Sequence, residues 1–340
     1  MNYFSTLKNK CRTKIQPTLV FKFFFVVCLL FLLVVMVAYP EICSESFLDG
    51  LILFSSAVLP SLFPFLFITK MLTDFGLAQK IANFAKKPFK IVFGANPQSF
   101  YVLLMSLLCG YPVGAKIVSD MACNGQITKQ EAEEMLPFCS SSGPLFVIGT
   151  VGFGMFGNKK FGIKLFLIHV LSVFAVAFII CNVRRIFRKK NNYLNSFVVN
   201  KNLDQFLAKN MIDTCSSVLL VGGFISFFYL VIDILTKFKI LFPLTYIFAF
   251  VFGVFGIDAA FAKGISSGIV EMTRGCQELS LVGGNFSLVA VSAILAFGGI
   301  SIILQSIAFL SKARISIKKF LGIKIMQTAI AVCIAILFSF

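Results

Sequence analysis

Residues 108–116 read LCGYPVGAK and residues 140–144 read SSSGP, and both stretches lie inside otherwise apolar sequence. Each region is too hydrophobic for a soluble loop, yet its glycines and prolines would break a continuous helix. Inside a bilayer, non-helical backbone persists only where protein buries it or where it lines a wet cavity. We therefore interpret the region from Ser99 to Phe156 as the core of a substrate-binding site.

The composition is that of a multi-pass membrane protein. Of 340 residues, 58% are hydrophobic and 13% are charged, and the mean hydropathy is +0.93. Lys and Arg outnumber Asp and Glu by 31 to 14. These bases lie in short clusters between apolar runs, which is typical of cytoplasmic loops and argues against a nucleic-acid partner.

The sequence contains no recognisable catalytic or metal-binding motif. The ten cysteines form no CxxC pair, and His169 is the single histidine, so we expect no metal site and no cofactor. No phosphate-binding GxxxxGK[ST] motif is present. We predict that the protein is not an enzyme, and that any transport is facilitated or driven by an ion gradient.

Charge clusters predict the orientation of the first spans. A basic cytoplasmic N-terminus at 1–18 precedes an apolar run at 19–39, which we predict as an anchor helix. A second span at 51–72 returns to a basic loop at 80–90. The strongest basic cluster is a cytoplasmic linker at 184–211.

Three apolar segments lie between these two cytoplasmic loops, at 98–124, 131–156 and 161–181. An odd number of crossings cannot begin and end on one side of a membrane. We therefore expect the segment at 98–124 to be a re-entrant helical hairpin, with its tip at Gly110 to Gly114.

Short patterns in the first half recur in the same order about 160 residues later. The pairs are SSAVL at 55–59 with SSVLL at 216–220, MLTDF at 71–75 with ILTKF at 234–238, SGP at 142–144 with FGG at 297–299, and KKFGIK at 159–164 with KKFLGIK at 318–324. We predict a duplication, with a first repeat at 51–183 and a second repeat at 212–340.

The second repeat begins after a cytoplasmic linker, so its first helix runs outward and the two repeats are inverted. Inverted repeats with interrupted helices are typical of secondary transporters. The predicted fold class is an all-α polytopic membrane protein with about seven spanning helices and two re-entrant helical hairpins. This topology places Lys159 and Lys160 outside, against the positive-inside tendency.

Several blocks of the sequence resemble the sporulation integral membrane protein family (YlbJ). They are GYPVGAK at 110–116, ITKQEAE at 127–133, SGPLFVIGTVG at 142–152, GIVEMT at 268–273 and AFGGIS at 296–301. More distantly, the order of hairpin, connector and broken helix is similar to concentrative nucleoside transporters and their nucleoside-recognition Gate domains, so we describe both repeats as Gate-like.

The resemblance implies a protein of endospore-forming bacteria that is needed late in sporulation. It further implies movement of dipicolinate out of the mother cell across the outer forespore membrane, with the N-terminus in the cytoplasm. The tip at 111–114 has no acid, unlike the ribose-binding region of nucleoside transporters, which argues against a nucleoside substrate.

We expect the broken segments of both repeats to form one substrate-binding site. Half-helix N-termini carry partial positive charge and bind anions, so a small dicarboxylate such as dipicolinate would suit two of them. The residues expected to bind substrate are Gly110, Tyr111, Pro112, Gly114, Lys116, Ser140, Ser141, Ser142, Gly143, Pro144, Ser266, Ser267, Glu271, Gly298, Gly299, Ser301 and Gln305.

Each of these assignments has a purely structural alternative. Lys116 would be the counter-charge for a carboxylate, or it pairs with Asp120 one turn later. The small residues would line the site, or they let helices pack closely. Glu271 would carry a proton, or it pairs with Lys263 or Arg274.

Three functions therefore remain open at the level of sequence. The leading interpretation is a transporter or facilitator of a small organic anion, with dipicolinate first. The second is a carrier of nucleosides or other small solutes, and the third is a non-transporting membrane scaffold in sporulation. The sequence leaves open whether copies of the chain form a homo-oligomer in the lipid bilayer.

Overall fold

The fold is described from a computed structural model, which covers residues 19–75, 80, 83–84, 86–187, 203–284 and 286–339. These residues form helices and connecting turns, and no strand occurs among them. Four helices in this part are long and apolar enough to cross a membrane, and a pair bent by 107° makes a fifth if it is counted as one span. The all-α membrane fold is confirmed, whereas the count of about seven spans stays a prediction.

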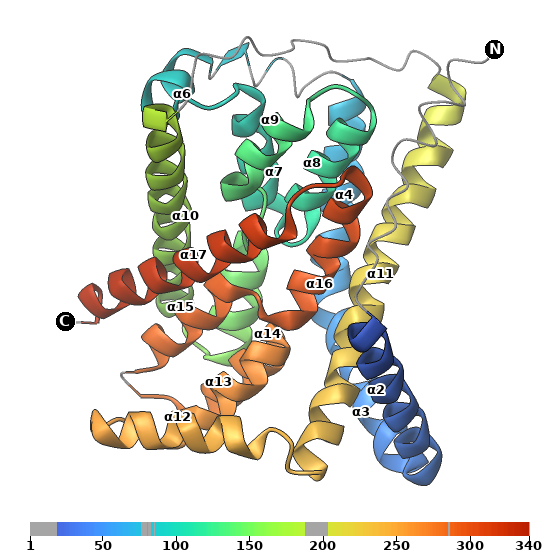
Figure 1. Ribbon diagram of the computed structural model, residues 1–340, viewed down its shortest axis with the longest axis vertical. Helices are drawn as coiled ribbons and strands as arrows, with labels where there is room; N and C mark the ends of the chain where they lie inside the picture. The colour runs from blue at the N-terminus through green and yellow to red at the C-terminus, as the bar shows by residue number, and fades with distance from the viewer. Residues whose placement is uncertain are drawn as a thin grey trace.

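The N-terminal part is a V-shaped pair of helices followed by a wide helical turn. Helix α2 (Leu19–Ala38) matches the predicted anchor helix, and α3 (Pro40–Leu53) begins with proline, whose missing N–H costs nothing there. A π-helical segment, η1 (Phe54–Val58), joins α3 to α4 (Leu59–Asp74). The span expected at 51–72 is therefore part of a longer helical path from Pro40 (Figure 1).

The first half then contains the expected hairpin and the expected break. Its elements are α6 (Lys86–Phe93), α7 (Gln98–Cys109), α8 (Val113–Cys123), α9 (Lys129–Met135), η2 (Leu136–Phe138), η3 (Leu145–Met155) and α10 (Lys159–Phe187). Helices α7 and α8 are joined at 110–112, where Gly110 has φ +77° and ends α7 as only glycine does easily. Residues 140–143 are not helical, as the SSSGP pattern predicts.

The second half contains the remaining elements. They are α11 (Leu203–Lys237), α12 (Phe242–Val254), α13 (Phe261–Val270), α14 (Met272–Val282), α15 (Ser287–Phe297), α16 (Gly299–Leu310), η4 (Ser311–Ala313) and α17 (Ile317–Leu337). The second hairpin turns at Glu271, one of the residues expected at the site, whereas Ser266, Ser267 and Gly268 lie inside α13.

The turns that precede α10 and α17 lie at opposite ends of the molecule. Helix α10 runs from Lys159 to beyond Arg184, a rise of about 37 Å between the two. Arg184 donates a hydrogen bond to the carbonyl oxygen of Glu133, and the carboxylate of Glu133 pairs with Lys319 at the start of α17. The start of α17 therefore lies toward the same end of the molecule as the end of α10.

Short helices and hairpins follow the same opposed arrangement in Figure 1. Helix α6 and the α7–α8 hairpin lie toward the upper end, whereas α12 and the α13–α14 hairpin lie toward the lower end. Long helices α10 and α11 connect the two ends. This arrangement is the one expected of two inverted repeats.

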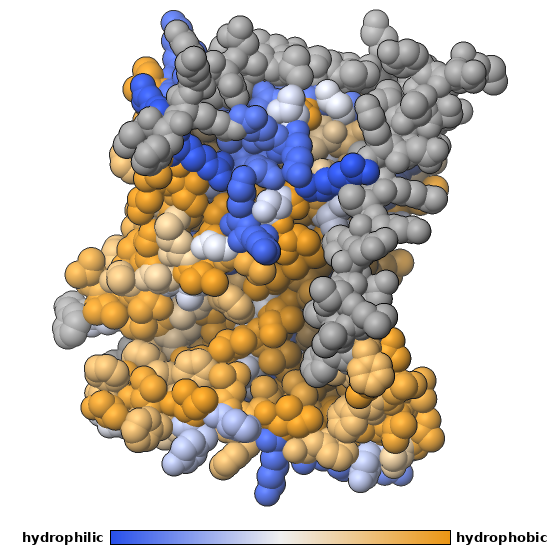
Figure 2. Space-filling model, viewed as in Figure 1, coloured by the Kyte–Doolittle hydropathy of each residue, from blue (hydrophilic) through white to orange (hydrophobic). Residues whose placement is uncertain are grey.

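The surface is apolar over most of the molecule. Phe153, Leu219 and Phe250 are 68%, 68% and 66% exposed, which suits contact with lipid tails. Figure 2 shows hydrophobic surface over much of one face and hydrophilic residues gathered toward its upper end. A multi-pass protein buried in a bilayer has this distribution.

Candidate functional site

Both hairpin tips, the first broken segment and helix α16, which follows the second break, border one cavity of about 80 Å³. This is room for on the order of five waters. Its lining residues are Val58, Leu62, Phe65, Leu108, Cys109, Gly110, Tyr111, Ser142, Gly143, Leu145, Phe146, Val221, Ile225, Glu271, Met272, Thr273, Ile302 and Gln305. The predicted convergence of the two halves at one site therefore occurs.

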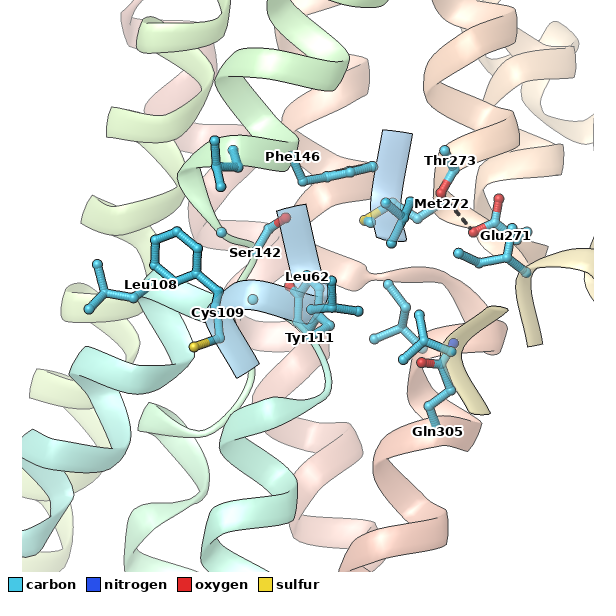
Figure 3. A pocket seen from close by; sticks show the side chains of 18 residues that line it. Leu62, Leu108, Cys109, Tyr111, Ser142, Phe146, Glu271, Met272, Thr273 and Gln305 are labelled. Carbon is cyan, nitrogen blue, oxygen red and sulfur yellow. Dashed lines mark hydrogen bonds between the residues drawn. The ribbon is translucent and has the colours of Figure 1, made fainter. Parts of the chain in front are cut away.

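The first half contributes a glycine-to-glycine contact between its hairpin tip and its broken segment. A Cβ atom on Gly110 would lie 2.9 Å from the backbone nitrogen of Gly143, and one on Gly143 would lie 3.1 Å from the carbonyl oxygen of Leu108. No side chain fits between these backbones. The cavity wall at this point is therefore peptide backbone, flanked by Ser142 and Tyr111 (Figure 3).

The second half contributes the tip at Glu271 and the break at Gly298. The carboxylate of Glu271 caps α14: it accepts a hydrogen bond from the backbone N–H of Arg274 at 2.7 Å and one from the Thr273 hydroxyl at 3.1 Å. Glu271 is 1% exposed and lines the cavity. Buried carboxylates are tolerated when such hydrogen bonds satisfy them.

The structural alternative for Glu271, a side-chain pair with Lys263 or Arg274, is not the arrangement found. Both of those cationic side chains contact Glu278 instead, at 3.7 Å and 3.3 Å, and Arg274 also contacts Asp233 at 3.3 Å. Sequence spacing alone does not show that the Glu271 carboxylate accepts a hydrogen bond from the backbone N–H of Arg274 at the start of α14.

The break at Gly298 brings α16 against the second hairpin tip. Gly298 and Gly299 have φ of +86° and +72°, and a Cβ atom on Gly299 would lie 3.0 Å from both the Gly268 carbonyl oxygen and the Met272 nitrogen. One turn on, Gln305 donates to the Ser301 hydroxyl at 3.3 Å and faces the cavity, opposite Ser142 in Figure 3.

Six of the residues predicted to bind substrate line this cavity: Gly110, Tyr111, Ser142, Gly143, Glu271 and Gln305. The others lie outside its lining: Pro112, Gly114, Lys116, Ser140, Ser141, Pro144, Ser266, Ser267, Gly298, Gly299 and Ser301. Gly114 has a packing role, because a Cβ atom there would lie 2.3 Å from the Cys139 carbonyl oxygen.

Lys116 is arranged as its structural alternative predicted. Its ammonium group lies 3.0 Å from the carboxylate of Asp120 and 5.9 Å from the centre of the Phe309 ring. Its side chain is 21% exposed. A lysine that is already paired and lies outside the cavity has little charge to offer a ligand there.

His169 is packed and holds the broken segment. It is 2% exposed, and its Nε2 accepts a hydrogen bond from the backbone N–H of Ser142 at 2.9 Å. The Ser141 hydroxyl lies 3.0 Å from the same nitrogen. The imidazole therefore fixes the unwound segment that lines the cavity, which agrees with a packed histidine.

Two polar residues near the cavity escaped the sequence reasoning. Thr273 lines it directly, and Lys324 lies behind Tyr111, with its Nζ 3.0 Å from the tyrosine oxygen. Lys324 carried the same signal that drew attention to Lys116, a cation inside an apolar run. In the sequence, however, Lys324 is also the last residue of the basic KKFLGIK pattern at 318–324, which hides this signal.

Comparison with known proteins agrees with this architecture. A family model described as Gate, nucleoside recognition, matches residues 55–159. The resemblance predicted from sequence is confirmed. Over 337 residues the chain is 26% identical to the sporulation integral membrane protein YlbJ of Bacillus subtilis (strain 168), which covers 93% of this chain and 81% of that protein. No solved structure matches.

Proposed function

We propose that this protein is a membrane transporter or facilitator that carries a small organic anion through the cavity between the hairpin tips, with dipicolinate as the first candidate. The observation that supports this most strongly is the lining itself. The two hairpin tips, the first broken segment and helix α16 of the second half line a single cavity, and transporters built from inverted repeats bind their substrates at such a meeting point.

The helix ends around the cavity favour a negatively charged ligand. Leu145 and Phe146 begin η3, and Met272 and Thr273 begin α14, and all four line the cavity. The first amides of a helix carry partial positive charge. The charge of Glu271, which caps α14 beside Met272 and Thr273, is engaged by the Arg274 amide and the Thr273 hydroxyl.

The sporulation relative supports the cellular setting. We place the protein in the outer forespore membrane of a sporulating cell, with a cytoplasmic N-terminus and dipicolinate leaving the mother cell. The two halves, at 51–183 and 212–340, would then act as inverted Gate-like repeats on either side of the cytoplasmic linker at 184–211. The opposed positions of the turns before α10 and α17 support this inversion.

Uptake into proteoliposomes tests the proposal. Vesicles that contain the full chain should take up labelled dipicolinate faster than empty vesicles. Val221→Phe should lower that rate severalfold, because Val221 lines the cavity from α11. Leu219→Phe is the matched control on the same helix, since Leu219 is 68% exposed. Equal rates for protein-containing and empty vesicles would contradict the proposal.

A nucleoside or another neutral solute is the second candidate, favoured by the side chains of Glu271, Thr273 and Gln305 in the cavity. Carboxylate, hydroxyl and amide groups can form hydrogen bonds with the hydroxyls of a ribose. Competition separates the candidates: uridine or adenosine should slow dipicolinate uptake only if the cavity accepts nucleosides.

The third candidate, a non-transporting scaffold, makes the opposite prediction in cells. A scaffold should tolerate Ser142→Leu and Gly143→Leu with sporulation intact, whereas replacement of the bases from Arg184 to Lys209 should abolish its role. A transporter should lose function through the first two substitutions, because both residues line the cavity.

A further inference from the structure

Lys324 is a buried lysine that has no carboxylate partner among the residues that the structure describes. It is 1% exposed, and it is the only buried lysine or arginine among the side chains that the structure describes. It forms no ion pair with any described carboxylate. Lysine is almost never fully buried unless it is paired, because desolvation of the charge is costly.

The groups around Lys324 are neutral. Its Nζ donates to the Tyr111 oxygen at 3.0 Å and to Oε1 of Gln327 at 3.2 Å. Tyr111 donates its one hydroxyl hydrogen to the Leu295 carbonyl oxygen at 2.9 Å, so it can only accept from Lys324. Nε2 of Gln327 is buried with no hydrogen-bond partner. The groups around the Lys324 side chain therefore include a hydrogen-bond donor without a partner and no anion.

Tyr111 connects Lys324 to the cavity. Its ring lies 4.7 Å from the Lys324 ammonium, and the same residue lines the cavity at the first hairpin tip. Tyr111, Phe65 and Phe146 also give the cavity three aromatic rings, against which a flat ring packs well. The cavity therefore has aromatic walls with a positive charge behind one of them.

We infer that Lys324 is a positioning residue that acts through Tyr111 and supplies the positive charge by which the cavity selects a planar aromatic carboxylate over an uncharged molecule of the same shape. This inference rests on the proposed function and names the residue behind its charge selectivity. In a medium of low dielectric constant, a charge one residue away from a ligand is weakly screened.

Binding of two ligands of one shape tests the inference. The probes are dipicolinate and pyridine-2,6-dicarboxamide, its uncharged diamide, and the readout is the ratio of their affinities for the purified full-length protein in detergent. The wild-type protein should prefer dipicolinate. Lys324→Met should lower this preference about tenfold or more, because a charge one residue away from the ligand is weakly screened in this medium, and Lys324→Arg should retain most of it.

A matched control separates charge from general surface effects. Lys164 occupies the position in KKFGIK that Lys324 occupies in KKFLGIK, and it is exposed on α10. Lys164→Met should leave the affinity ratio unchanged. A purely structural role for Lys324 would weaken both probes equally or lower only the melting temperature.

Each outcome bears on the inference. If Lys324→Met does not fold, Tyr111→Phe removes the hydroxyl link alone, and it should also reduce the preference for dipicolinate. An unchanged ratio in Lys324→Met, or in Tyr111→Phe where the first variant is unfolded, overturns the role of Lys324 and leaves the proposed function standing. A wild-type protein that binds neither probe would contradict both the role of Lys324 and the proposed function.

Discussion

Gly110 lies where the first hairpin tip meets the broken segment, and two requirements fix it as glycine. Its φ of +77° belongs to the left-handed region, and an added Cβ atom would lie 2.9 Å from the Gly143 nitrogen. The backbone strain of such a φ costs alanine about 1 kcal/mol, and overpacking adds about 1–3 kcal/mol.

We expect Gly110→Ala to lower the melting temperature of the purified protein markedly and to stop uptake. Gly125→Ala is the control, because Gly125 has φ +70° but an added Cβ would meet nothing within 4 Å. Its effect should be limited to the strain of about 1 kcal/mol. Equal melting temperatures for the two variants would show that the contact with Gly143 does not matter.

Glu271 gives a second prediction at the residue scale. Its carboxylate caps α14, and loss of an N-cap costs about 0.5–2 kcal/mol. We expect Glu271→Ala to destabilise the protein and to change transport, since Glu271 also lines the cavity. Ser316→Ala removes the N-cap of α17, away from the cavity. It should lower the melting temperature comparably and leave the affinity for substrate unchanged.

The sequence predicts the residues of the first tip and of both breaks better than those of the second tip. Glycine and proline at 110–112 can only interrupt a helix. The serines at 266 and 267 can also lie inside one: the Ser266 hydroxyl donates to the Ala262 carbonyl oxygen at 2.8 Å. Gly268 serves packing, because an added Cβ would lie 2.3 Å from Ile294. Sequence pattern cannot distinguish a glycine that packs from one that turns.

At the scale of elements, the contact between η3 and α10 holds the broken segment in place. These helices cross at Gly152 and Gly162, where a Cβ atom on Gly152 would lie 2.4 Å from the Gly162 Cα atom. Small residues permit such approaches between membrane helices. The position of Leu145 and Phe146 at the cavity depends on this crossing, because they begin η3.

Gly152→Ala should therefore push η3 away from α10, lower the melting temperature and reduce substrate affinity. Gly154→Ala is a control within the same helix, since its added Cβ would come no closer than 3.5 Å to any atom outside its immediate neighbours. Thermal unfolding in detergent, with and without dipicolinate, measures both effects. A larger loss for Gly154→Ala than for Gly152→Ala would contradict this account of the crossing.

At the scale of the whole molecule, the sequence predicts the order of elements because the same patterns recur in both halves. It does not predict how the elements are arranged in space, because contacts such as the one between Glu133 and Lys319 join residues 186 apart in sequence. The cavity depends on such long-range contacts, and so does the burial of Lys324. Local composition marks a charged residue inside an apolar run, but it does not say which cavity that residue approaches.

The central claim is that two oppositely oriented halves meet at one cavity, and the orientation of two exposed lysines tests it most directly. Lys159 lies at the start of α10 and Lys312 lies just before α17, and both are exposed. Lys159→Cys and Lys312→Cys, each in a protein without its other reactive cysteines, would be labelled in cells and in inverted vesicles with a membrane-impermeant maleimide. The account predicts labelling from opposite sides of the membrane, and labelling of both from the same side would contradict it.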